Sequence, residues 1–432
     1  MAINEFIRLN VILPLAERVQ GTCATKWYKQ INKMSTWSSD EIKKWQETEL
    51  QKFIKHAYNH TVYYKRTFDE LGIDPSEIKT PEDLKKIPVI TKDIIRSHYY
   101  ELIPDDLHKF KHRISVTGGT TGKPMRYLCD ENTWGYVTAA KIYYWKKTGY
   151  KYGDPFAALG SASILSLKPS FKRMIYDKIR NEIGINSMGI DNNICENYIN
   201  VIRKKHIHYI YGYASSIYVF AKYIIDSNIE INKIKAVFTT SENLTEHYRE
   251  VIEKAFNCIV MDCYGAKDAG ITAYEAFRGQ YNVGYNVIAE DVNGVLLSTN
   301  FINNSFPLIR YDFGDSATLS TSPTQYNGQT ITHIAGRISD MISLDNGRTL
   351  TAPGFTILMP KFDIKAFRIK QTSGSDLLVQ IQPIIDKFDD SQEVILLNEM
   401  KRLAGEGCNV KIEHVAKFES LPNGKNNFFF NS

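Results

Sequence analysis

The chain has 432 residues, of which 43% are hydrophobic and 23% charged, and its formal net charge is +5 at pH 7. This length exceeds one ordinary domain, and this composition is typical of a globular protein with substantial cores, which excludes a disordered or fibrous chain. Its charges are dispersed, which weakly favours anionic small molecules over nucleic acid, and no apolar run reaches the roughly 20 residues needed to cross a bilayer.

The N-terminal 110 residues are predicted to be mainly helical. The short apolar run Val11–Ala16 predicts an amphipathic helix that docks on the core, with contact to a membrane surface as the alternative. It lacks the features of a signal peptide. Ser39 is a candidate cap, and apolar positions recur at three- and four-residue spacing to Leu71, which predicts a helix over 39–71. Thr80 followed by proline predicts a second capped helix start.

A predicted strand at 113–116 leads into a glycine-rich loop, Thr117–Pro124. Glycines let the backbone approach an anion, hydroxyls and amides donate hydrogen bonds, and the lysine adds positive charge, so the loop suits a polyphosphate. A flexible glycine turn is the alternative. A Walker A loop, and with it a P-loop phosphotransferase, is excluded because Thr117 stands where the first glycine is required and Pro124 follows the lysine. The candidate phosphate-binding residues are Thr117, Gly118, Gly119, Thr120, Thr121, Gly122 and Lys123.

The middle of the chain alternates between helix-like and strand-like segments. This alternation predicts stacked β-α units, an α/β fold and mixed, largely parallel sheets. Ligands usually bind at the carboxyl ends of such strands. The predicted helices are 197–205, 216–227 and 246–256, and the predicted strands are 208–211, 236–239 and 259–262.

After Gly336 the pattern changes to a compact α+β module. Two extended stretches, 367–372 and 377–382, precede a helix over 391–403 and a strand over 409–414. We therefore expect a large domain over 1–336, with a helical leading region over 1–110, and a small domain over 337–432.

Six cysteines are too sparse to suggest a disulfide framework, and a reducing cytoplasm is the simplest setting. Cys258 and Cys263 are neighbours in sequence, with His247 and His206 as candidate companions in a zinc site. No C-x-x-C or H-x-x-x-H spacing supports zinc binding there.

Five segments occur in an order that is hard to assign to chance: 117–124, Tyr264–Asp268, Arg310–Asp315, Gly336–Ile342 and Gly424-Lys425. In this order they resemble the phosphate loop and the Y-G-x-[ST]-E, R-Y-x-x-G-D, G-R-x-D-D-x-I and G-K segments of the adenylate-forming superfamily of acyl- and aryl-CoA synthetases. Within it, the set resembles the phenylacetate–CoA ligase and CapK-type branch. Tyr63–Lys65 and Ile87–Lys92 also resemble the CapK-type entry segments, and the likeness covers nearly the whole chain.

The resemblance implies an ATP site. Asp315 would accept hydrogen bonds from the ribose hydroxyls, Tyr264 would stack on adenine, and Arg337 would contact the nucleotide near the domain joint. Their structural alternatives are a turn aspartate, a buried aromatic and an ion pair. Asp268 stands where the family usually has a glutamate near bound Mg²⁺. The remaining nucleotide-binding candidates are Ser241, Glu242 and Gly265.

The resemblance also implies a catalytic lysine and a mobile joint. Lys425 would neutralise the carboxylate and the α-phosphate as they meet, and an exposed lysine in a terminal loop is the alternative. Ser339 and Asp340 would form the hinge, with Ser339 replacing the family's aspartate. Lys267 and Asp268 also depart from the family pattern, which leaves open a catalytically degenerate, nucleotide-binding member.

The implied reaction is ATP- and Mg²⁺-dependent activation of a small-molecule or sugar carboxylate as an acyl-adenylate. The small mobile domain would then swing, and a nucleophile would displace AMP. That acceptor would be the thiol of coenzyme A, a carrier-protein thiol or an amine. The CapK-type likeness points by analogy to surface-polysaccharide assembly. We expect no nucleic-acid partner and no integral membrane segment, and a homodimer is compatible with this interpretation.

Overall fold

A computed structural model of the chain describes residues 5–117, 125–160, 171–186, 189–320, 324–335, 341–351, 355, 358–359, 362–384, 388–405, 407–416, 418 and 429–431. The chain divides into two compact units. Unit 1 comprises 1–117, 125–154 and 261–336, and unit 2 comprises 118–124, 155–260 and 337–432. One passage between the units therefore follows Gly336, where the sequence predicts a domain boundary, but 155–260 group with 337–432. The predicted division into domains 1–336 and 337–432 stays a prediction.

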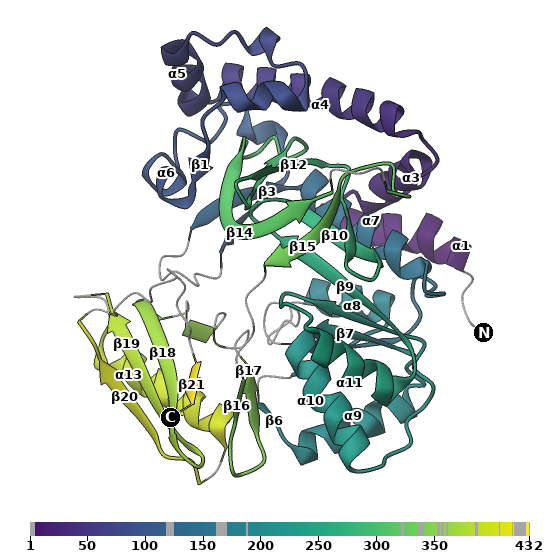
Figure 1. The fold of residues 1–432 in the computed structure, drawn as a ribbon, viewed down its shortest axis with the longest axis vertical. Helices are drawn as coiled ribbons and strands as arrows, with labels where there is room; N and C mark the ends of the chain where they lie inside the picture. The colour runs from purple at the N-terminus through teal and green to yellow at the C-terminus, as the bar shows by residue number, and fades with distance from the viewer. Residues whose placement is uncertain are drawn as a thin grey trace. The chain divides into compact units, whose positions relative to one another are not determined.

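The leading part of unit 1 is helical (Figure 1). Ser38, and not Ser39, caps the long helix through a capping box with Glu41. The single helix predicted over 39–71 is two helices, because the extended Thr61 ends α4 and its hydroxyl accepts the Tyr64 amide at the start of the next helix. The helical elements are α1 (Glu5–Ile7), η1 (Arg8–Ile12), α2 (Leu13–Gln20), α3 (Ala24–Met34), α4 (Ser39–His60), α5 (Val62–Leu71), η2 (Pro75–Glu77), η3 (Pro81–Lys86), α6 (Lys92–Ser97), η4 (Leu107–Lys109) and α7 (Glu131–Lys146).

These helices pack on the rest of unit 1. Leu13 of α2 contacts Ile142 and Tyr152 in a small buried cluster, so the predicted docking of the N-terminal helix is confirmed. On α4, the buried Gln46 amide donates to the Tyr285 carbonyl at 3.0 Å. The leading region is therefore joined to residues more than two hundred positions later.

The sheet of unit 1 is antiparallel, whereas the alternation along the chain predicts largely parallel sheets. Its strand order is β12-β13-β14-β15-β11-β10-β9, and the short β1 adds parallel to β14. A separate hairpin, β2-β3, flanks the glycine-rich loop. The strands are β1 (Ile90–Thr91), β2 (His112–Val116), β3 (Arg126–Asp130), β9 (Ile259–Ala266, unit 1 from residue 261), β10 (Ile271–Phe277), β11 (Gln280–Val283), β12 (Val287–Val292), β13 (Val295–Asn300), β14 (Tyr311–Leu319) and β15 (Thr330–Ala335).

The predicted parallel β-α arrangement is found in unit 2. Strands β5, β4, β7 and β8 pair in that order and in parallel, and α9, α10 and α11 contribute to one buried apolar cluster with them (Figure 1). Gly212 in β7 is required there, because a Cβ would lie 2.1 Å from the Leu159 carbonyl oxygen. The elements are β4 (Phe156–Gly160), α8 (Phe171–Arg180), β5 (Glu182–Asn186), β6 (Gly189–Ile190), α9 (Asn192–Lys204), β7 (Tyr209–Tyr213), α10 (Ala214–Asp226), β8 (Ala236–Thr240) and α11 (Glu246–Phe256).

The C-terminal part of unit 2 has the predicted α+β character. Strands β20-β19-β18-β21 form one sheet, and α13 shares an apolar core with it. The hairpin β16-β17 instead pairs with β6, and Arg348 forms an ion pair with Asp191 at 3.2 Å. The elements are β16 (Met341–Ser343), β17 (Thr349–Thr351), β18 (Ile364–Ser373), β19 (Asp376–Pro383), α13 (Asp390–Ala404), β20 (Val410–His414) and β21 (Phe429–Asn431).

Each of the six cysteines is a free thiol, as the sequence predicts. Every helix within the described residues is too short or too polar to cross a lipid bilayer.

Candidate functional site

The two ends of the glycine-rich loop are clamped together. The Thr117 amide donates to the Met125 carbonyl at 2.9 Å, and the Met125 amide donates to the Thr117 hydroxyl at 3.0 Å. This reciprocal pair extends the β2-β3 ladder by one step and fixes where the loop begins and ends. The other phosphate-binding candidates, 118–123, lie outside the described residues.

Asp315 lies in a β-bulge of β14, which sets the direction of its side chain. Opposite the neighbouring strand β13, Val295 pairs with Ser316 and Leu297 pairs with Asp312, so residue 296 alone faces 313–315. Gly314, at φ 90°, adopts the backbone conformation that such a bulge needs. Asp315 therefore lies within β14 and is not a turn aspartate, which was the structural alternative to its ribose role. Its Oδ2 accepts a hydrogen bond from the Tyr264 hydroxyl at 2.9 Å.

Asp268 is held by a second tyrosine. It lies in the turn between β9 and β10, and its Oδ2 accepts a hydrogen bond from the Tyr311 hydroxyl at 2.7 Å. The same hydroxyl lies 3.7 Å from the Met125 sulfur at the base of the glycine-rich loop. Tyr264 and Asp268 belong to the segment 264–268, and Tyr311 and Asp315 belong to the segment 311–315. Each segment therefore donates a phenol hydrogen bond to the carboxylate of the other. We call Tyr264, Asp268, Tyr311 and Asp315 the crossed tetrad.

Both phenols of the crossed tetrad remain donors at neutral pH. Burial, then the charge of Asp268, raises the pKa of Tyr311 far above its usual value. Burial, then the charge of Asp315, does the same to the pKa of Tyr264. An O–H donor stabilises the ionised form of the carboxylate that accepts from it. The tetrad therefore presents two oriented carboxylates, and Tyr311 connects it to Met125 at the base of the loop.

Other residues of the predicted motifs hold β14 in place. The buried Arg310 guanidinium pairs with Glu290 at 3.1 Å and donates to the Ile87 carbonyl at 2.8 Å. Lys92 donates to the Phe313 carbonyl at 2.6 Å, inside the bulge. Ile90 and Thr91 pair in parallel with Tyr311 and Asp312. The segment Ile87–Lys92 is thus part of the support for the strand that carries Asp315.

Gly265 is required by strand pairing. It lies in β9 opposite Thr272, and an added Cβ would lie 3.3 Å from the Ile271 carbonyl oxygen, closer than ordinary van der Waals contact. A Cβ here would require a small shift between β9 and β10, and the turn that carries Asp268 joins these two strands.

Ser241 and Glu242 follow the carboxyl end of β8 in unit 2. Ser241 has φ 68°, a left-handed conformation that is uncommon for a residue with a side chain. The Glu242 carboxylate accepts from the Ser215 amide at 2.8 Å and from the Ser215 hydroxyl. Because Ser215 is the second residue of α10, Glu242 caps the positive end of that helix.

Arg337, Ser339, Asp340 and Lys425 lie outside the described residues and remain predictions. Sequence reasoning had assigned no role to Tyr311, although the tyrosine of the R-Y-x-x-G-D segment was visible. It also missed Ser215 as the partner of Glu242, because these two residues are 27 positions apart and meet only through parallel strand pairing.

No family model matches the chain. It is 26% identical to protein CapK of Staphylococcus aureus over 94% of this chain and 92% of that protein. It is 22% identical to the phenylacetate–coenzyme A ligase of Pseudomonas putida over 86% of this chain and 89% of that protein. The crystal structure of 2-hydroxyisobutyryl-CoA ligase with 2-HIB-AMP and CoA matches with a TM-score of 0.59 at 17% identity, over 92% of this chain and 91% of that one. The last comparison establishes the fold of the chain.

Proposed function

The chain is a relative of CapK and of the phenylacetate–CoA ligases within the adenylate-forming superfamily, and on this premise we propose that it is an ATP-dependent ligase that activates a carboxylate. The crossed tetrad beside the base of the glycine-rich loop is the observation that carries the proposal. It supplies a carboxylate for hydroxyl groups and a carboxylate for a cation, and Tyr311 contacts Met125, the residue that follows the glycine-rich loop.

Asp315 is the proposed ligand of the ribose. A carboxylate has two oxygens, and the Tyr264 hydroxyl engages only Oδ2 in the tetrad. The bond from Tyr264 fixes the rotation of the carboxylate, so that Oδ1 and the remaining lone pair of Oδ2 are available for two neighbouring hydroxyls. This gives Tyr264 a positioning role in addition to the proposed stacking on adenine.

Asp268 is the proposed contact for Mg²⁺. It is half-buried, and Tyr311 orients it through Oδ2, so the residues present fit a hard cation that prefers carboxylate oxygens. Bound Mg²⁺ would neutralise phosphate charge. The hydrogen bond from Tyr311 would fix the rotation of the Asp268 carboxylate.

The proposed reaction has two steps. A carboxylate oxygen bonds to the α-phosphorus of ATP while the bond from that phosphorus to the bridging oxygen breaks, which releases pyrophosphate. A thiol or an amine then attacks the acyl carbon, and its proton passes to solvent as AMP leaves. Residues 117–123 would hold the phosphates, Lys425 would balance the charge in the first step, and Arg337 would contact the nucleotide.

Further proposed features rest on the resemblance. Ser339 and Asp340 would form the hinge about which the small domain moves between the first and the second step. Ser241 and Glu242 would contact the nucleotide. Because relatives are named as CoA ligases and as CapK, we propose coenzyme A as one acceptor and a small-molecule or sugar carboxylate as substrate. A role in surface-polysaccharide synthesis and a cytoplasmic location complete the proposal.

The test is direct detection of the acyl-adenylate. The purified protein is incubated with ATP, Mg²⁺ and a panel of carboxylic acids, including uronic and aryl acids, and acyl-AMP is measured by mass spectrometry. Asp315→Ala serves as the matched loss-of-site variant. Acyl-AMP from the wild-type chain alone supports the ligase. Binding of ATP without any acyl-AMP would instead favour the degenerate member that Lys267 and Asp268 leave open.

A further inference from the structure

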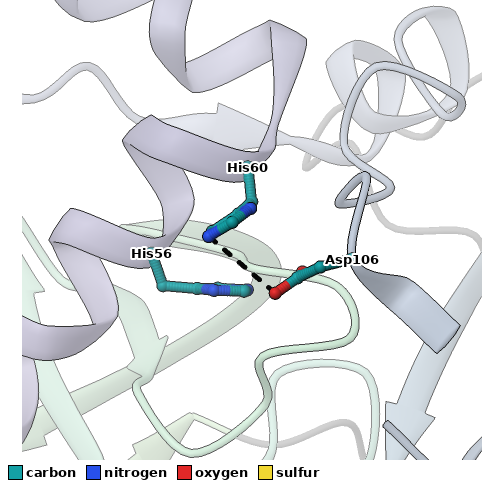
Figure 2. A group of neighbouring side chains, drawn as sticks. All are labelled: His56, His60 and Asp106. Atoms are coloured by element: carbon teal, nitrogen blue, oxygen red, sulfur yellow. Dashed lines mark ion pairs between the residues drawn. The ribbon is translucent and has the colours of Figure 1, made fainter. Parts of the chain in front are cut away.

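A second cluster of ligand-type side chains lies in the helical leading region, away from the crossed tetrad in sequence. His56 and His60 are one turn apart on α4, and Asp106 precedes η4. One ligand atom from each residue lies within 4.8 Å of the others, and Figure 2 shows the three side chains converging. Among the described residues this is the one such group of three or more, and it does not include Cys258 or Cys263.

Hydrogen bonds fix the tautomer of each histidine. His56 Nε2 lies 3.0 Å from the Asn304 carbonyl oxygen. Because a carbonyl only accepts, Nε2 carries the proton and Nδ1 keeps its lone pair. His60 Nδ1 lies 2.7 Å from Asp105 Oδ1, so that nitrogen donates to the carboxylate and Nε2 keeps its lone pair. Each ring therefore has one nitrogen held by the protein and one free to bind a metal.

The third side chain, Asp106, has one oxygen without a hydrogen-bond partner. Asp106 is only 8% exposed, and its Oδ1 is buried without a hydrogen-bond partner. Its Oδ2 lies 3.8 Å from His60 Nε2 and 3.3 Å from the Lys109 ammonium. Buried polar atoms in folded proteins are almost always paired, so the unpaired Oδ1 of a carboxylate that faces His60 through Oδ2 and lies near His56 points to a missing cation.

We propose that His56, His60 and Asp106 bind one divalent transition-metal ion, with zinc as the best match. Two imidazole nitrogens and one carboxylate oxygen form a donor set that zinc accepts in its tetrahedral sites, with water as the fourth ligand. Zinc bonds of about 2.0–2.1 Å to each atom would need the His60 and Asp106 atoms to be slightly closer than 3.8 Å. The three ligand atoms lie within 4.8 Å of one another, and side-chain rotations on metal binding would have to bring them closer.

The surroundings match those of established metal sites. Metal-bound histidines usually donate their other N–H to a carboxylate or a backbone carbonyl, and here His60 donates to Asp105 and His56 to Asn304. The ion would join α4 to the segment that runs into β2 and would also be tied to the segment at Asn304. This site is independent of the proposed function. Without metal, the plain explanation is a hydrogen bond between His60 and Asp105 together with an ion pair between Lys109 and Asp106.

Metal stripping and reloading separate these two explanations. The full chain is treated with a chelator, titrated with Zn²⁺ against a chromophoric competitor, and examined with Co²⁺ by visible absorption. We expect one tight site per chain that is weakened in His60→Gln and Asp106→Asn by more than about 100-fold. His108→Gln, which removes an exposed histidine near the cluster, is the matched control and should bind as wild type does.

Two further variants keep the test decisive if a ligand variant unfolds. Asp105→Asn should weaken zinc by about 10–100-fold, because it changes only the group that orients His60. Lys109→Gln removes a solvent-exposed competitor cation from Asp106 and should tighten binding. A wild-type chain without a micromolar zinc site would overturn the proposal. So would zinc that survives in folded His60→Gln but is lost in Cys258→Ser or Cys263→Ser.

Discussion

Gly314→Ala tests whether the bulge in β14 creates the ribose site. Gly314 has φ 90°, and the nearest atom to an added Cβ is the Lys92 ammonium nitrogen at 4.0 Å. The substitution therefore causes no clash, and its effect is the conformational energy of a left-handed alanine, about 1–2 kcal/mol. Reduced entropy of the unfolded chain offsets about 0.4–1 kcal/mol of this. We expect a net loss of about 1 kcal/mol in the free energy of unfolding.

Gly294→Ala is the matched control. Gly294 has φ 81°, has nothing within 4 Å of an added Cβ, and lies in the turn between β12 and β13. Both variants should therefore lower the urea midpoint by a similar amount. Only Gly314→Ala should relax the bulge and loosen the 2.9 Å bond between Tyr264 and Asp315.

The expected change in ATP affinity follows from the energy of the hydrogen bond between Tyr264 and Asp315. Hydrogen bonds to charged groups contribute about 1.5–3 kcal/mol, and about 1.4 kcal/mol corresponds to a tenfold change in affinity. We expect the dissociation constant for ATP, measured by calorimetry, to be at least tenfold larger in Gly314→Ala and unchanged in Gly294→Ala. Equal ATP affinities in the two variants, with equal losses of stability, would refute the reasoning.

Four more outcomes are expected. Asp315→Ala should weaken both ATP and AMP in calorimetry, because a ribose contact acts in ground and transition states alike, and unaltered affinities would contradict it. Lys425→Ala should slow pyrophosphate release about 10²–10³-fold while ATP affinity stays within a few-fold of wild type; unchanged release would remove Lys425 from the mechanism. Ser339→Pro, which fixes a backbone torsion at the proposed hinge, should spare adenylate formation at least partly and reduce acyl transfer much further, whereas equal loss of both steps in a folded variant would count against the hinge. Burial raises the pKa of Asp130 from 3.8 to about 6, so its contribution to stability is present below pH 3.8 and is lost as pH rises through 6. From pH 4 to 7, the free energy of unfolding of the wild type should therefore fall relative to that of Asp130→Asn. A difference between the two that does not change with pH in urea titrations would contradict this.

Local signals were enough for much of unit 2. The helix predicted over 246–256 is α11 with the same ends, because Thr245 caps it and its apolar face repeats at helical spacing. Strands β7 and β8 were also placed within two residues, because short apolar runs between capped helices have few alternatives. Likewise, the order of the motifs predicted the relationship that the comparisons confirm.

Features that depend on particular side-chain bonds or on strand register were not predictable. Thr61 is compatible with a helix by itself, and the break there comes from its hydroxyl bonds to Ala57 and Tyr64. The bulge at Phe313–Asp315 depends on the register with β13, which no local pattern encodes. Pairing of β6 with β17 joins residues about 160 positions apart, which is why 337–432 looked self-contained in the sequence.

The histidine pair was missed for a different reason. His56 and His60 have the H-x-x-x-H spacing that puts both side chains on one helix face, but two histidines are too few for a zinc site and no third ligand of the proposed site is near them in the sequence. Asp106 gives no signal of its own, because its proximity to α4 follows from the backbone bond between Asp105 and His60.

The parallel pairing of β1 with β14 also bears on how the chain is made. Lys92 and Phe313 are 221 positions apart, so β1 leaves the ribosome long before its partner strand exists. At about 5–20 residues per second the delay is roughly 10–40 s. During that time Ile90 of β1, which is buried and pairs with Tyr311 in the folded chain, has no partner strand. Nascent chains stalled before residue 311 should therefore recruit a chaperone that binds exposed apolar segments, and release it once β14 has been synthesised.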